Sequence, residues 1–180
     1  MDAHFQIILP EIEKTITESQ SYEPLLAALR MMRRLFRSKP FGVEANFMKE
    51  NDRILKILKS SLQHDYSKVV SEALRVTGSF LNALRTKETS TISSSQASLA
   101  QSLYDLITVK LDKVDIDQDV KSCSIIAAAN LVAVCHTVLQ PMKISHIITI
   151  FSDRLQQELT RDATLKGLTM IALNESSLKS

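Results

Sequence analysis

The chain has 180 residues, of which 44% are apolar and 23% are charged, so it is long enough to bury a continuous core. Its 22 basic and 20 acidic residues leave a net charge of +2, which favours neither a nucleic acid nor an anionic membrane as partner. Three glycines, no tryptophan and 5% aromatic residues argue against a β-sandwich, a Gly-rich phosphate loop or a base-stacking surface.

Apolar residues recur at helical spacing along almost the whole chain, and no comparable stretch alternates with a period of two. Ser21 suits a cap before the second predicted helix, Pro24 suits its first turn, and residues 39–42 end it. One apolar stripe at helical spacing is formed near the C-terminus by Ile148, Phe151, Leu155 and Leu159. In chain order, the predicted helices cover about 4–19, 22–38, 45–64, 67–85, 97–113, 117–139, 141–159 and 161–173.

The predicted helices form a repeat. Residues 22–26 recur 44 positions later as 66–70, and Val70 corresponds to Val120 after 50 positions and to Leu165 after a further 45. Such spacing is typical of HEAT and armadillo arrays of ~40–47 residues, and two helices per unit favour HEAT. We therefore predict an all-α, HEAT-type α-α superhelix in a single segment, 1–180, with units of about 1–42, 43–86, 97–140 and 141–175.

One connection is longer than the others. Six of the seven residues 89–95 are Ser or Thr, and they have no apolar face to pack, so we expect a surface loop over 86–98 that is either a plain linker or a phosphorylation site. Residues 174–180 end without a polar capping helix, which leads us to expect a fragment of a longer protein.

The helix at 117–139 is the most apolar and should be buried on several sides. No apolar run reaches the ~20 residues of a membrane span, and the N-terminus lacks the basic start of a secretory signal. We expect an intracellular protein, cytoplasmic and nuclear, with no membrane partner.

Residues 115–119 alternate Asp like the start of a calcium loop. Val120 stands where that loop needs Gly, and Ile126 stands where it needs a bidentate Glu. We therefore interpret the aspartates as caps for the free N–H groups of the following helix. Asp65 holds the position equivalent to Asp115 in the repeat.

The remaining chemistry-bearing residues do not converge. Cys123 and Cys135 lie too far apart on one predicted helix for a disulfide, and neither forms a nucleophile–base pair with a histidine. Gly167 should permit close helix packing, as should Gly78. We predict no enzyme, no metal, no cofactor and no small-molecule substrate; the histidines, at irregular spacings, are His4, His64, His136 and His146.

One surface feature stands out. Arg30, Arg34 and Arg37 share a face of the helix at 22–38, away from the apolar stripe that runs from Leu25 to Phe36. As the second helix of its pair, it should line the concave side of the array, where such proteins hold partners. The three arginines are the candidate protein-binding residues, with an ordinary solvated face as the alternative.

Several stretches resemble the cullin-associated, neddylation-dissociated proteins, a family of long HEAT-repeat scaffolds. Residues 114–121 are similar to the family's "DIDQEVK" stretch, residues 154–169 to its "RLKNEITR…TVKALT" stretch, and residues 71–77 to a third. The match is strong across about 66–173, and before that mainly the apolar pattern agrees.

The resemblance implies a non-catalytic scaffold that binds a cullin–RING core and regulates the assembly of cullin–RING ubiquitin ligases. It carries no contact residue over to this chain, because the family's cullin contacts lie toward the two ends of the long protein. The alternative is an importin-like or other HEAT-repeat adaptor, although importin-type arrays are expected to carry acidic inner helices and the helix at 22–38 is basic.

Overall fold

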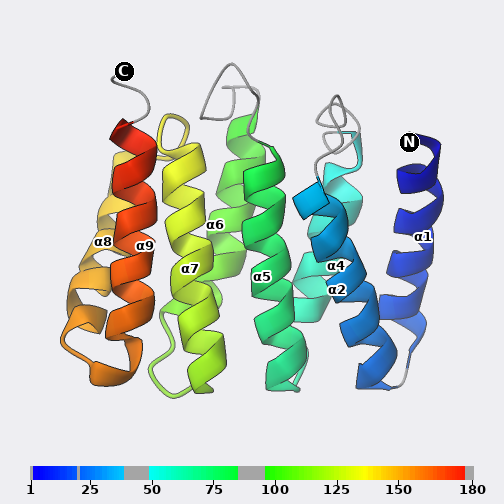
Figure 1. Cartoon of the computed structure of the whole chain (residues 1–180), viewed down its shortest axis with the longest axis horizontal. Coiled ribbons are helices and arrows are strands. Elements are labelled where there is room, and N and C mark those ends of the chain that lie inside the picture. The colour runs from blue at the N-terminus through cyan, green and yellow to red at the C-terminus, as the bar shows by residue number, and fades with distance from the viewer. Residues whose placement is uncertain (1, 20, 39–48, 85–95, 177–180) are drawn as a thin grey trace. The chain divides into compact units, whose positions relative to one another are not determined.

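The computed structural model describes residues 2–19, 21–38, 49–84 and 96–176. Every regular element in these ranges is an α-helix, which confirms the all-α class (Figure 1). The chain divides into two compact units, Met1–Leu84 and Arg85–Ser180. The helices are α1 (Asp2–Glu18), α2 (Tyr22–Ser38), α4 (Asn51–Leu62) and α5 (Ser67–Ala83) in the first unit, and α6 (Ala97–Leu111), α7 (Gln118–Cys135), α8 (Pro141–Leu155) and α9 (Glu158–Ser176) in the second.

In the first unit, the two helix pairs α1–α2 and α4–α5 pack side by side. The second helices, α2 and α5, are in contact along their length, and α1 lies against α4 (Figure 1). The rings of Phe36 and Phe80, both fully buried, meet at 5.1 Å between centroids. On the other layer, Glu13 of α1 pairs with Lys56 at 2.8 Å and Arg53 at 2.9 Å, both from α4.

The second unit repeats this arrangement with α6–α7 and α8–α9. Here α7 and α9 make the main contact (Figure 1). A Cβ on Gly167 would lie 3.0 Å from the Cβ of Ala129 and 3.4 Å from the ring of Phe151, so the absence of a side chain permits the close approach of α9 to α7. The close-packing role predicted for Gly167 is confirmed. Contact between the second helices of successive pairs is the packing that HEAT-type solenoids use.

The observed helix ends agree well with the prediction for α2 and less well near the C-terminus. The predicted helices 141–159 and 161–173 are α8, which ends at Leu155, and α9, which begins at Glu158. The break is fixed by Thr160, whose hydroxyl donates to the backbone carbonyl of Arg154 at 2.9 Å. The predicted start of the helix at 45 and most of the loop 86–98, including the whole Ser/Thr stretch, lie outside the described residues.

The apolar stripe predicted for this region is wrong in two of its four members. Ile148 is 36% exposed and Leu159 is 74% exposed. The buried side of α8 instead runs through Ile147, Phe151 and Arg154. Arg154 is only 5% exposed, because its guanidinium reaches across to the carbonyls that end α6: it donates to Leu111 at 3.3 Å and to Lys113 at 3.1 Å.

The expected burial of the most apolar helix is confirmed. The segment Gln118–Cys135, α7, contacts α6, α8 and α9, and its buried residues are spread around its circumference. It is also the one described helix whose length and composition would let it cross a membrane, but 72% of it is buried inside the protein, as expected for a core helix.

Candidate protein-binding surface

The three predicted arginines all lie exposed on α2, the second helix of the first pair. Arg33 belongs to the same face, because Arg30, Arg33, Arg34 and Arg37 follow the spacing i, i+3, i+4 and i+7 that places residues on one side of a helix. We call these four residues the basic ridge. The apolar residues of α2, which include Leu29, Met32 and Phe36, are buried on the other side, so the separation of charge from core is confirmed.

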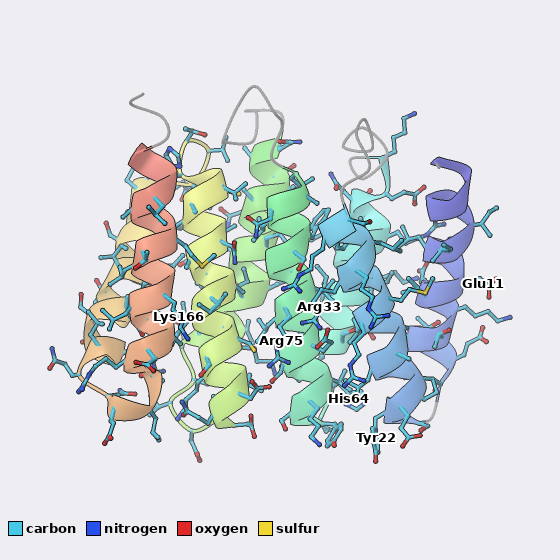
Figure 2. All side chains as sticks on the ribbon, in the orientation of Figure 1. Glu11, Tyr22, Arg33, His64, Arg75 and Lys166 are labelled. Carbon is cyan, nitrogen blue, oxygen red and sulfur yellow. The ribbon has the colours of Figure 1, made fainter. Side chains whose placement is uncertain are left out.

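Arg33 differs from its three neighbours because it is held by a buried carboxylate. Its Nε lies 2.9 Å from Oε1 of Glu72 on α5, and Nη1 of Arg75 lies 3.5 Å from Oε2 of the same carboxylate. Glu72 is 4% exposed, so each cation compensates a charge that would be costly to bury alone. Figure 2 shows Arg33 where α2 adjoins α5, and Arg75 on α5. The pair fixes the edge of the basic ridge against α5.

An aromatic pair marks the beginning of the same two helices. Tyr22 and Tyr66 lie 4.6 Å apart between ring centroids, and the Lys68 ammonium lies 5.9 Å from the Tyr66 ring. The backbone N–H of Tyr66 donates to Nδ1 of His64 at 2.9 Å. Tyr22 is 46% exposed, and Figure 2 shows Tyr22 and His64 at the lower end of the first unit. Tyr22 lies eight residues before Arg30, about 12 Å along the helix, so the aromatic pair is separate from the basic ridge.

The capping interpretation of the Asp run is confirmed at one residue. Oδ1 of Asp117 accepts from the backbone N–H groups of Asp119 at 2.9 Å and Val120 at 3.3 Å, at the start of α7. The analogy with Asp65 fails, because α5 begins at Ser67 after the N-cap residue Tyr66, with no side-chain cap, and the N–H of Tyr66 donates to His64 instead.

The cysteines are core residues. Cys123 and Cys135 are free and buried, and burial raises the pKa of the Cys135 thiol to about 12. A thiol with such a pKa is a poor nucleophile at neutral pH. Within the described ranges, no three His, Cys, Asp or Glu side chains are grouped so that they could hold a metal ion.

Sequence reasoning missed a polar cluster between α6 and α8. The Tyr104 hydroxyl and Nδ1 of His146 share a hydrogen bond of 2.8 Å, and Nε2 of His146 lies 3.4 Å from Asp112. Lys143 lies 4.3 Å from the Tyr104 ring centroid and 3.5 Å from Asp105. Burial, and then Asp112 and Asp105, raise the pKa of Tyr104. Most of these contacts join residues about forty positions apart, so no local sequence pattern predicts them.

The chain is similar to a known protein family and to a curated relative. A family described as "CAND1-like, TPR repeats" matches residues 1–128. Cullin-associated NEDD8-dissociated protein 1 of Drosophila melanogaster is 28% identical over 121 residues, which cover 66% of this chain and 10% of that protein. The chain thus spans about a tenth of the length of the curated relative it matches.

The family match is placed differently from the resemblance seen in the sequence. It includes the first helix pair, where mainly the apolar pattern agreed, and it ends before the similar stretch at 154–169. The family description speaks of TPR repeats, whose period is about 34 residues, whereas spacings of 44, 50 and 45 positions lie at or just above the HEAT length.

Proposed function

Since the chain belongs to the CAND1-like family of helical repeat proteins, we propose that it is a non-catalytic scaffold that binds a cullin–RING core. On this proposal it acts in the cytoplasm and nucleus, in the assembly of cullin–RING ubiquitin ligases. The proposal is supported by the name of its Drosophila relative, which describes cullin association. Such a role requires of the fold only that helices present side chains on one face.

The observation that carries the binding role is the basic ridge on α2. Three of its arginines are exposed, and the fourth is held in place by Glu72. A row of cations on a rigid helix attracts an acidic surface over a distance of about a Debye length, roughly 8–10 Å in physiological salt. It therefore raises the rate of encounter more than it slows dissociation.

The test is the association rate of the whole chain with a purified, unmodified cullin–RING core at two salt concentrations. The variant carries Arg30→Glu, Arg34→Glu and Arg37→Glu. We expect association to slow by about tenfold at low salt and its salt dependence to flatten. The helix should remain folded, because Arg and Glu differ little in helix propensity and the buried stripe is unchanged.

A matched control reverses the same amount of charge elsewhere, at three exposed lysines: Lys59→Glu, Lys113→Glu and Lys166→Glu. If both triple variants slow association equally, the effect comes from the net charge of the chain, and the basic ridge has no special role. If the wild-type chain does not bind the cullin–RING core at all, the cullin proposal fails.

An importin-like adaptor is the second candidate. It predicts the opposite preference, for basic cargo, which the basic ridge would repel. The importin-like adaptor would be favoured if the chain bound a lysine-rich peptide and not the cullin–RING core. The Arg→Glu variant should then bind the peptide more strongly.

A further inference from the structure

Arg33 is the member of the basic ridge that an ion pair holds in place. Its Nε lies 2.9 Å from Oε1 of Glu72, a buried residue of α5, at the seam between the two helices (Figure 2). The side chain of Arg33 is still 26% exposed. Nε belongs to one edge of the guanidinium plane, and the outer edge, formed by the two Nη groups, is suited to bind a carboxylate in a bidentate manner. Arg33 therefore combines a fixed position with an edge that suits a second carboxylate.

Arg75 sets the net charge at this seam. If Glu72 were paired with Arg33 alone, the two charges would cancel, and an anion would meet no net attraction. Nη1 of Arg75 lies 3.5 Å from Oε2 of Glu72, so two guanidinium groups face one carboxylate and one positive charge remains. The pairing with Arg75 thus lets Glu72 hold Arg33 without neutralising the seam.

The surrounding surface of α2 and α5 is basic as well. The two helices carry six basic and two acidic residues. One of the acids is the buried Glu72, and the other is Glu23, which lies in the first turn of α2, ten residues before Arg33 and so about 15 Å along the helix. Exposed Lys68 lies seven residues before Arg75 and hence on the same line of α5. Charge complementarity therefore favours an acidic occupant at this seam.

We propose that Arg33 binds a carboxylate side chain of an acidic protein partner directly, and that Glu72 positions Arg33 for this contact. The inference rests on the proposed function, because it names the point at which the acidic partner is held. The exposed arginines of the basic ridge act through their charge and govern the association rate. Arg33 acts through hydrogen bonds whose direction the guanidinium plane fixes, so it governs the dissociation rate.

The role of Glu72 can be separated from simple electrostatics, because the two make opposite predictions. Glu72→Gln removes a negative charge and makes the surface more basic, so charge alone predicts tighter binding of an acidic partner. A positioning role predicts weaker binding, because Arg33 then loses the contact that fixes its rotamer before the partner arrives.

The first probe is the purified, unmodified cullin–RING core, with association and dissociation rates measured separately by surface plasmon resonance on the intact chain. We expect Arg33→Lys, which keeps the charge and lacks the planar fork, to raise the dissociation rate about tenfold and to leave the association rate unchanged. Glu72→Gln should also raise the dissociation rate, without slowing association. Thermal unfolding of each variant shows whether it remains folded, and Arg33→Lys tests the contact even if Glu72→Gln does not fold.

Each variant has a matched control on α2. Arg30→Lys makes the same change at an exposed arginine of the basic ridge, and Glu23→Gln removes the same charge from an exposed position. Both should leave the dissociation rate unchanged. Equal effects of Arg33→Lys and Arg30→Lys, or slower dissociation in Glu72→Gln, overturn the proposal while leaving the cullin proposal intact.

A second probe tests the contact without a cullin. It is an alanine-based helical peptide with glutamates along one face, compared with its glutamine counterpart at low salt. In NMR spectra of the chain, the Nε–H signal of Arg33 should shift with the glutamate peptide more than the signals of the other ridge arginines, and should not shift with the glutamine peptide. Such a shift without binding of the cullin–RING core would sink the cullin proposal and support the Arg33 contact. Equal shifts at all ridge arginines, no binding of either probe, or tighter binding of a phosphoserine version of the peptide would overturn the carboxylate contact.

Discussion

The two units build the same pair-on-pair contact from different side chains. In the first unit, α2 and α5 meet through the buried rings of Phe36 and Phe80 and through the Arg33–Glu72 ion pair. In the second, α7 and α9 meet at Gly167 and Ala129, where a Cβ on the glycine would already be crowded. The repeat therefore preserves where helices touch, while the residues that fill the contact are free to change.

The difference predicts that the first unit is sensitive to a loss of side-chain volume at its contact, and the second unit to a gain. A contact filled by large rings should suffer most from truncation, which leaves a cavity. A contact closed by a glycine should suffer most from added volume, which forces the helices apart.

The largest effect should come from Phe80→Ala in the first unit. Phe80 is fully buried, so its loss should lower the free energy of unfolding by about 3–5 kcal/mol. The amides of α2 and α5 should exchange faster, which hydrogen-exchange mass spectrometry would detect. Val109→Ala, at a side chain 58% exposed, should cost less than about 0.5 kcal/mol. A loss below 1 kcal/mol for Phe80→Ala would mean that the ring contact does not hold the pairs together.

Gly167→Leu should have the next largest effect. The new side chain would meet Ala129 and Phe151, and we expect a loss of about 1–3 kcal/mol in urea unfolding. Ala172→Leu introduces the same residue at an exposed position of the same helix and serves as the control. Equal stability of the two variants would show that α9 can move away from α7 without cost.

The smallest effect concerns the ion pairs between α1 and α4. The hydrogen bond from Lys56 is the main cause that lowers the pKa of Glu13 below its ordinary 4.5, with the charges of Lys56 and Arg53 adding to it against the opposing effect of burial. A lowered folded-state pKa stabilises the protein above the unfolded value and loses that contribution as pH falls through the folded value.

Glu13→Gln should therefore cost about 0.5–1 kcal/mol at pH 7, a small figure because Lys56 is 69% exposed to screening by solvent. The difference between wild type and variant should shrink as the pH falls below 4.5 and vanish at still lower pH. Thermal unfolding at several pH values measures it, with Glu18→Gln as an exposed control on the same helix. A difference that persists in acid would have a cause other than the ion pairs.

The fold was predictable where the amphipathic pattern is strong. The helix α2 has the predicted bounds, because its stripe and its arginines separate on the helix surface. Around residues 155–160 the apolar pattern misled, since Leu159 is exposed and Arg154 is buried. A buried arginine that ties the end of another helix depends on residues more than forty positions away, which no local pattern contains.

The candidate surface was predictable in part. The exposed arginines follow from helical spacing alone, and the same spacing should have included Arg33. Its partner Glu72 could not be foreseen, because an acidic residue in a helix is normally exposed and only the packing of α5 on α2 buries it.

The two buried thiols give the second unit a property that the first lacks. The only two cysteines of the chain lie on α7, and both are buried. An alkylating reagent in neutral solution can react at a useful rate only with molecules in which α7 has opened, since the pKa of Cys135 falls toward its ordinary value once the thiol meets water. The rate of thiol labelling therefore reports the opening of the second unit alone, and no cysteine has to be introduced for the measurement.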